Sequence, residues 1–267
     1  MPTLKQNLMA EFIGTMFLVA VAIGSTVLPM TVPGWTISLT IFINALAVAM
    51  VLFALIETFG SVSGAHFNPA VTLAILSSKE ISPRKAAYYI MAQMAGGFIG
   101  LLIVGFMFYG YNPNILIVSS NVKDAGQVFA EFVGTFLLIG IIFGCVRGRS
   151  KNTSLAVAFV VGGMLITTSS TMFANPAVTF NRMFTYAICG IAPVSGVLFI
   201  IAEVVGALVA VVVFSTIFPA KLKEKCEPFE CPALANGPRP ITISTESPAG
   251  RSARCEPFEC PPNGRSK

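Results

Sequence analysis

The sequence predicts an all-α membrane protein with six transmembrane helices and two re-entrant half-helices, arranged as an inverted repeat. Hydrophobic residues make up 55% of the chain and charged residues only 11%, whereas soluble domains carry about 25% charged residues. Apolar runs of spanning length recur along the chain, and the tripeptide Asn-Pro-Ala occurs twice among them. Non-helical backbone at membrane depth is tolerated only where it is buried in protein or lines a water-filled cavity.

Six apolar runs are close to or above the roughly 20 residues that a helix needs to cross the hydrocarbon core. They cover residues 8–30, 37–59, 86–109, 128–147, 154–170 and 194–217, and the fifth is the shortest. The first run follows a single cation, Lys5, and no small-residue cleavage site is evident. We therefore interpret it as a retained span rather than a signal peptide.

Most cations fall on one side of the predicted membrane. They lie after the second, fourth and sixth spans: Lys79, Arg84, Lys85, Arg147, Arg149, Lys151, Lys221, Lys223 and Lys225. Because Lys and Arg mark the cytoplasmic side, we expect a multi-pass protein of the cell membrane with both termini in the cytoplasm. The formal net charge of +5 follows from this topology, and we expect no nucleic-acid partner.

Three landmarks recur in the same order in the two halves of the chain. The pairs are Ala-Glu-Phe-(Ile/Val)-Gly-Thr at 10–15 and 130–135, Asn-Pro-Ala-Val-Thr at 68–72 and 175–179, and the related segments 89–93 and 199–203. An odd number of spans in each half inverts the second copy in the membrane. We predict a channel domain over residues 1–218, with repeats at about 8–109 and 128–217, and a disordered cytoplasmic tail over 219–267.

Glu11 and Glu131 lie inside the first and fourth predicted spans. A carboxylate at such a position costs about 2.5–3.5 kcal/mol on insertion scales, so it needs hydrogen-bond donors. A re-entrant loop offers unpaired backbone N–H groups. We expect each glutamate to brace one such loop; the alternative is a carboxylate near the interface that reaches water.

Each Asn-Pro-Ala predicts the start of a short helix, because Asn is a favoured N-cap and Pro suits the first helical position. The helices would run from about Pro69 to Leu76 and from about Pro176 to Tyr186. Their N-termini, each with roughly half a positive charge, would meet near the membrane midplane and repel cations. The amides of Asn68 and Asn175 would donate hydrogen bonds to a passing solute. The expected midplane residues are Asn68, Pro69, Ala70, Asn175, Pro176 and Ala177.

These motifs resemble those of the aquaporin, or major intrinsic protein, family. Ser-Gly-Ala-His-Phe-Asn-Pro-Ala-Val-Thr at 63–72 is similar to the first signature of that family, and the doubled Ala-Glu-Phe motif also fits. The resemblance covers about residues 5–218. It implies the aquaporin-like fold, a pore in every subunit, a homotetramer in the lipid bilayer, and small neutral solutes as permeants.

The chain departs from this family directly after the second Asn-Pro-Ala, where most members have Arg and this chain has Val178. By the spacing usual in the family, the other selectivity-filter positions are Val48, Gly163 and Met172. The resemblance is to an aquaglyceroporin-like bacterial branch with Val in place of the filter arginine. It implies a wide, apolar filter that passes glycerol-like polyols, urea-like solutes, metalloid hydroxides such as arsenite, and some water.

Two further polar residues are candidates for the vestibules of the pore. Arg182 lies four residues after Val178 and thus on nearly the same helix face, so it could reach back to the mouth; alternatively, backbone carbonyls hold it at the outer surface. His66, the only histidine, could line the inner vestibule and respond to pH. The alternative for His66 is a structural role.

Two other classes of protein are compatible with parts of this pattern. Inverted repeats also occur in secondary transporters, where intramembrane carboxylates such as Glu57 and Glu203 could couple protons to transport. The third class is a non-conducting sensor or scaffold. The sequence has no Ser/His/Asp set, His-based metal site or phosphate loop, so we expect no enzymatic activity, no cofactor and no metal in the channel.

The predicted tail contains the segment Cys-Glu-Pro-Phe-Glu-Cys twice, at 226–231 and 255–260. Stable disulfides are not expected in the cytoplasm, whereas thiolates suit soft ions such as Zn²⁺ and also trivalent arsenic. A metal- or arsenic-sensing tail and a duplicated segment without a site remain the two interpretations.

Overall fold

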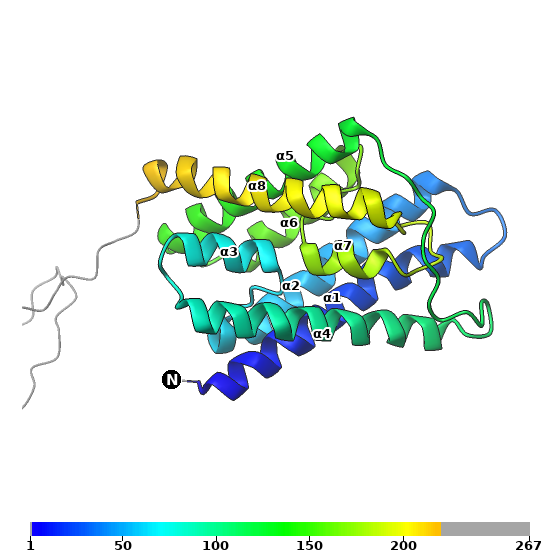
Figure 1. The fold of residues 1–267 in the computed structure, drawn as a ribbon, viewed down its shortest axis with the longest axis horizontal. Coiled ribbons are helices and arrows are strands. Elements are labelled where there is room, and N and C mark those ends of the chain that lie inside the picture. The colour runs from blue at the N-terminus through cyan, green and yellow to red at the C-terminus, as the bar shows by residue number, and fades with distance from the viewer. Residues whose placement is uncertain (1, 220–267) are drawn as a thin grey trace, which may run out of the picture. The chain divides into compact units, whose positions relative to one another are not determined.

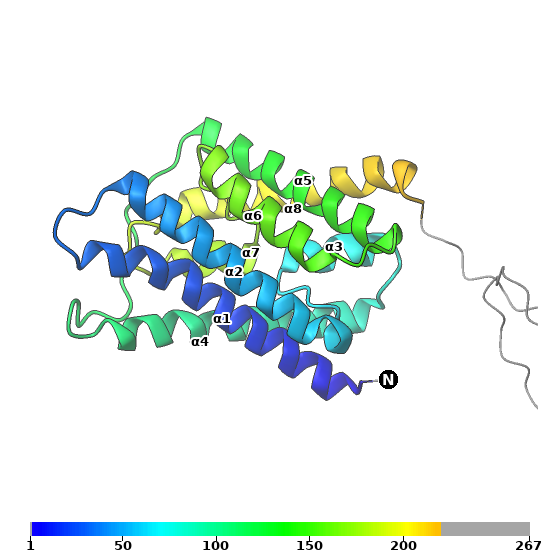
Figure 2. The same ribbon diagram turned by 180° about the vertical axis from the view of Figure 1, so that it is seen from behind.

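The computed structural model describes residues 2–219, so the predicted tail and its two cysteine segments lie outside the described residues. The described chain forms eight helices (Figures 1 and 2). They are α1 (Leu4–Met30), α2 (Ile37–Ser63), α3 (Pro69–Ser77), α4 (Pro83–Met107), α5 (Ala125–Arg147), α6 (Thr153–Thr167), α7 (Pro176–Arg182) and α8 (Pro193–Ile217). Five of them are long and apolar enough to span a membrane, and α6, with 15 residues, is a shorter apolar helix.

The observed helices confirm the predicted elements and extend some of their ends. Helix α1 begins at Leu4, before the apolar run, because Thr3 and Gln6 form a capping box that satisfies backbone N–H groups at its start. Helix α2 continues to Ser63, where Gly64 adopts a φ of 91° and ends the helix in the left-handed region that glycine tolerates.

The predicted end of the second half-helix at Tyr186 is wrong. Helix α7 ends at Arg182, because backbone N–H groups of the loop before α5 donate hydrogen bonds to the carbonyl groups of the residues after Arg182. The backbone N–H of Ser119 donates to the carbonyl of Met183 at 2.9 Å, and that of Ile117 to the carbonyl of Phe184 at 3.3 Å. These carbonyls are thus bonded without further helical turns.

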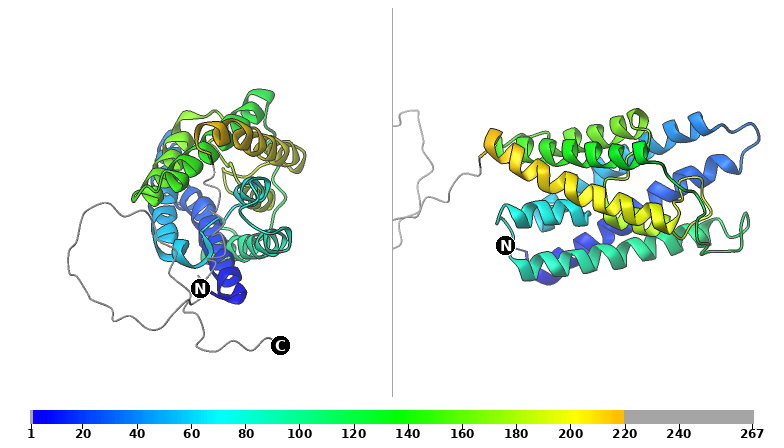
Figure 3. Two further views of the ribbon diagram at one scale, coloured as in Figure 1. Left: turned by 90° about the vertical axis from the view of Figure 1, so that its left-hand side faces the viewer. Right: turned by 45° about the horizontal axis from the view of Figure 1, so that its top comes forward.

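The two halves of the chain pack in the same way. Helix α1 packs on α2 and α4 in the first half, and α5 packs on α6 and α8 in the second. Each half-helix also packs against the other half, α3 on α8 and α7 on α4. The half-helices lie between the long helices, and the start of α1 and the end of α8 lie at the same end of the bundle (Figures 1 and 3).

Glycines allow the closest of these helix crossings. A Cβ atom on Gly96 of α4 would clash with the backbone carbonyl of Phe12, and one on Gly206 of α8 would lie 2.5 Å from the carbonyl oxygen of Phe132. Small residues permit such backbone approach between membrane helices. The outer faces carry large apolar side chains, for example Phe129 at 66% exposure, as contact with lipid requires.

Candidate pore

The two Asn-Pro-Ala segments meet tip to tip inside the bundle. The side-chain amide of Asn68 donates to the carbonyl of Ala174 at 2.7 Å, and that of Asn175 donates to the carbonyl of Phe67 at 2.9 Å. Each asparagine Oδ1 also accepts the backbone N–H groups two and three residues further on, which confirms both residues as N-caps. These bonds use one N–H of each amide and leave the other for a different acceptor.

Glu11 is fully buried in α1 and accepts hydrogen bonds from the loop before Asn68. Its Oε1 accepts the backbone N–H of His66 at 3.0 Å, and its Oε2 accepts that of Phe67 at 2.8 Å. The amide of Gln93 on α4 donates to the same Oε2 at 2.8 Å. The carboxylate therefore joins α1, α4 and the loop.

Glu131 has the equivalent place in the second half. Its carboxylate accepts the backbone N–H groups of Phe173, at 2.9 and 3.0 Å, and of Ala174, at 2.7 Å. Phe67 and Ala174, the residues before the two asparagines, have φ values of 49° and 46°. Such left-handed backbone costs about 1–3 kcal/mol for a non-glycine residue. Each glutamate therefore hydrogen-bonds to the part of the loop whose backbone conformation is unfavourable.

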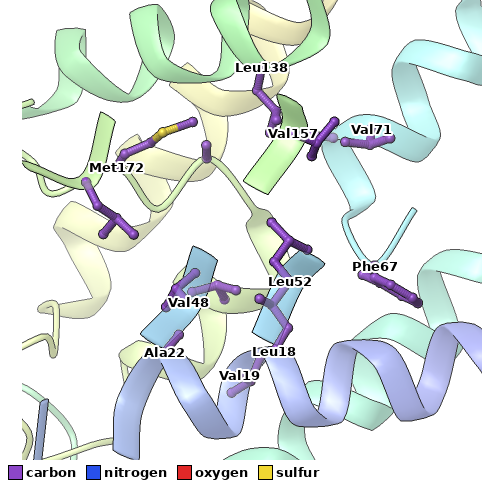
Figure 4. Close-up of a cluster of buried hydrophobic side chains, with 14 of the residues drawn as sticks. Leu18, Val19, Ala22, Val48, Leu52, Phe67, Val71, Leu138, Val157 and Met172 are labelled. Carbon is purple, nitrogen blue, oxygen red and sulfur yellow. The ribbon is translucent and has the colours of Figure 1, made fainter. Parts of the chain in front are cut away.

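A cavity inside the bundle is lined by residues of both loops. It has a volume of about 110 Å³, and one water needs about 10–15 Å³ by the same measure. Asn68, Asn175, Val48, Met172 and Val178 line it together, and most of its remaining wall is apolar. Figure 4 shows the cluster of buried apolar side chains that contains much of this wall, including Leu138 and Val157, together with side chains such as Val19 that do not line the cavity. No carboxylate lines the cavity within the described residues.

Gly163, one of the four expected filter residues, is not among the residues that line this cavity. It is exposed, and a Cβ atom there would meet nothing within 4 Å. It shares a helix face with Phe159 and Ile166, which are 66% and 56% exposed. With about 100° per residue, α6 instead turns Val161 and Leu165 to the cavity. The four-residue spacing of these apolar residues was the sequence signal for the lining face.

Arg182 and His66 both lie at the cavity. Arg182 is 2% exposed, and its Nη2 donates to the carbonyl of Ala22 at 3.0 Å. Arg182 is therefore held by a backbone carbonyl, as one sequence interpretation expected, and it also lines the cavity, as the other expected. His66 also lines the cavity. Its Nδ1 lies 3.1 Å from the Oγ1 of Thr72, and its ring packs edge-on against Tyr89.

The carboxylates of the transporter hypothesis lie outside the cavity lining. Glu203 is buried and accepts a hydrogen bond from the Thr179 hydroxyl of α7 at 2.5 Å. Glu57 is exposed near the end of α2 and accepts one from Ser154 of α6. Neither residue lines the cavity. They join helices and offer no carboxylate to a proton path through the cavity.

A second cavity lies beside Phe173 and contains Lys123 of the loop before α5. Burial lowers the pKa of the Lys123 ammonium group, and the positive charge of Arg182 lowers it further. Phe173 lines both cavities. The charged residues that line the two cavities, Lys123 and Arg182, are thus both cationic within the described chain.

Paired half-helices that meet beside a cavity within a bundle of apolar helices define a multi-pass membrane channel rather than an enzyme. The chain belongs to the major intrinsic protein family, whose family model matches residues 1–172. It is 34% identical over 208 residues to the aquaglyceroporin AqpS of Rhizobium meliloti (strain 1021), which covers 78% of this chain and 88% of that relative. An aquaglyceroporin of Toxoplasma gondii is 34% identical over 54% of this chain and 55% of the relative.

The fold is similar to that of a solved channel. The crystal structure of the aquaglyceroporin from Plasmodium falciparum matches 80% of this chain and 97% of that chain, with a TM-score of 0.66 and 22% sequence identity. At this identity the match supports the fold alone. The predicted aquaporin-like fold is therefore confirmed.

Proposed function

We propose that this channel passes small uncharged solutes by passive diffusion: glycerol-like polyols, metalloid hydroxides such as arsenite, and some water. The observation that carries the proposal is the cavity itself, in which the amides of Asn68 and Asn175 face a largely apolar wall. An apolar pathway favours uncharged solutes, because an ion that enters it loses hydration without compensation. The aquaglyceroporin relatives support the same class of permeant.

The proposed selectivity filter consists of Val48, Met172 and Val178, with Leu165 from α6 in place of Gly163. These side chains are buried and line one cavity. They present methyl and thioether groups, so they set the width of the path and do not bind water strongly. Valine at 178 also leaves the space that an arginine side chain would fill, and this supports passage of solutes larger than water.

The proposed molecular context follows from the family and the charge pattern. We propose a homotetramer with one pore per subunit, in the cell membrane, with both termini in the cytoplasm. The channel domain would comprise residues 1–218, and the chain would belong to an aquaglyceroporin-like bacterial branch with Val178 at the arginine position. Arg147 and Glu80 form an ion pair at 2.7 Å between the loop after α3 and the end of α5, and cations of the expected cytoplasmic side lie in the same regions.

Stopped-flow light scattering of proteoliposomes tests the function. Vesicles with the purified channel are exposed to an osmotic gradient for water flux and to gradients of glycerol, urea and arsenous acid. Empty vesicles are the control. We expect fast flux of glycerol and arsenous acid that rises linearly with concentration and needs no proton gradient. Saturation at low concentration or dependence on a proton gradient would indicate a transporter, and flux equal to that of empty vesicles would indicate a scaffold.

A further inference from the structure

The guanidinium of Arg182 is held at the cavity by few contacts. One nitrogen, Nη2, donates to the carbonyl of Ala22, and the group lies over the ring of Phe173, 4.1 Å from its centroid. The other two nitrogens, Nε and Nη1, are buried and have no acceptor among the described residues. The side chain as a whole is 2% exposed and lines the cavity.

The positive charge of Arg182 also has no close counter-ion. Within residues 2–219, no carboxylate oxygen lies within 4.0 Å of it. Burial of an unpaired ion costs several kcal/mol, and buried donors are normally hydrogen-bonded. Arg147, whose side chain is 8% exposed, has such a partner, because its Nη2 pairs with Glu80 at 2.7 Å. Glu131 and Glu203 interact with the charge of Arg182 only at longer range, and a charged residue inside a membrane protein is a candidate functional site.

The position of Arg182 relative to Val178 indicates the function of that site. Both residues lie on α7, four positions apart, so they share a helix face, and both line the cavity. The chain has an apolar side chain where the family has its arginine, and it has a guanidinium one turn further along the same wall.

We infer that Arg182 is a specificity-determining residue of the pore, whose positive charge beside the cavity repels cations and leaves neutral solutes unaffected. The inference rests on the proposed function as a channel for neutral solutes. Polyols and neutral hydroxides carry no net charge, so the charge of Arg182 does not repel them. Hydronium and alkali cations meet a fixed positive charge in a low-dielectric wall.

Proteoliposomes with Arg182→Met test this inference through two measurements. Glycerol flux is followed by light scattering, and potassium and proton leaks are followed with trapped fluorescent indicators. We expect the cation leak to rise about tenfold over the unmodified channel, equivalent to about 1.4 kcal/mol of barrier, while glycerol still passes. The double variant Val178→Arg/Arg182→Met returns a guanidinium to the same wall, so it should restore the low leak.

Arg147→Met is the matched control, because it removes a buried arginine that does not line the cavity. It should leave the cation leak unchanged even if it lowers stability. Two conservative variants separate charge from packing: Arg182→Lys keeps the charge and the low leak, whereas Arg182→Gln loses both.

Three results would overturn the inference. The first is a folded Arg182→Met channel with the leak and selectivity of the unmodified protein, and the second is an equal leak in the Lys and Gln variants. The third is loss of folding in all three variants, which would assign Arg182 to the core. Failure of the proposed function is distinct, because the unmodified channel would then pass none of the neutral solutes.

Discussion

The carboxylate of Glu131 accepts the backbone N–H of Ala174 at 2.7 Å, and Ala174 has a left-handed φ of 46°. The first half of the chain repeats this relationship between Glu11 and Phe67, at 2.8 Å and a φ of 49°. In both halves the residue in question lies directly before the asparagine that caps a half-helix. The glutamates therefore stabilise the strained backbone that places the two asparagine amides.

Glu131→Gln and Glu11→Gln should each destabilise the fold. A glutamine has one acceptor oxygen and turns an NH₂ group toward backbone N–H donors, which leaves a buried donor unpaired at a cost of about 1–3 kcal/mol. We expect a lower free energy of unfolding in detergent and reduced glycerol flux in proteoliposomes. Glu57→Gln is the control, because that carboxylate is exposed. A shift equal to that of the control would contradict the bracing role.

Val178→Arg should reduce the passage of larger solutes more than that of water. The new side chain enters a wall that already contains Arg182, so it narrows the path and adds a second positive charge. We expect glycerol and urea flux to fall by most of its value and water flux to change less, as measured by light scattering. Val178→Leu, which adds volume without charge, is the control. Equal reductions for water and glycerol would count against the filter assignment.

Arg147→Met should cost more stability than Glu80→Gln, although the two residues form one ion pair. Arg147 is nearly buried and also donates to the carbonyl of Phe218 at 2.7 Å and to the Ser215 hydroxyl at 3.2 Å. Its loss leaves these acceptors unpaired, at about 1–3 kcal/mol each where they are buried.

Loss of the Glu80 carboxylate removes only a half-exposed ion pair, worth about 0–1 kcal/mol. Denaturant unfolding in detergent measures both variants, and the Glu80→Gln difference should shrink in high salt. Equal losses would mean that the ion pair, not the hydrogen bonds, holds this end of the bundle.

The sequence predicted the elements of this fold because each has a local cause. Apolar runs of spanning length set the long helices, and Asn-Pro is a local signal for the start of a helix. The end of α7 was not predictable in this way, since it depends on Ser119 and Ile117, which are distant in the chain. Local signals thus predict where helices start better than where a distant loop ends them.

The lining of the cavity was harder to predict than the fold. Met172 and Val178 are close in the chain to the second Asn-Pro-Ala, and both line the cavity. Gly163 is not part of this lining, and the local sequence does not determine which face of α6 turns to the cavity, because the rotation of α6 about its axis depends on its packing against α2 and α5. The pairing of Arg182 with Ala22 likewise joins α7 to α1 and has no signal in the local sequence.

Gly163→Phe tests the orientation of α6 directly. The glycine lies on the exposed face of the helix, and a Cβ atom at this position would have no neighbour within 4 Å. A phenyl ring there should therefore extend into lipid and leave glycerol flux unchanged. Val161→Phe is the matched comparison, because it places the same ring two residues away, about 200° around the helix, on a side chain that lines the cavity. It should remove most of the glycerol flux in light-scattering assays. If Gly163→Phe blocks the channel and Val161→Phe does not, α6 is rotated in the membrane relative to this structure, and Gly163 returns to the filter.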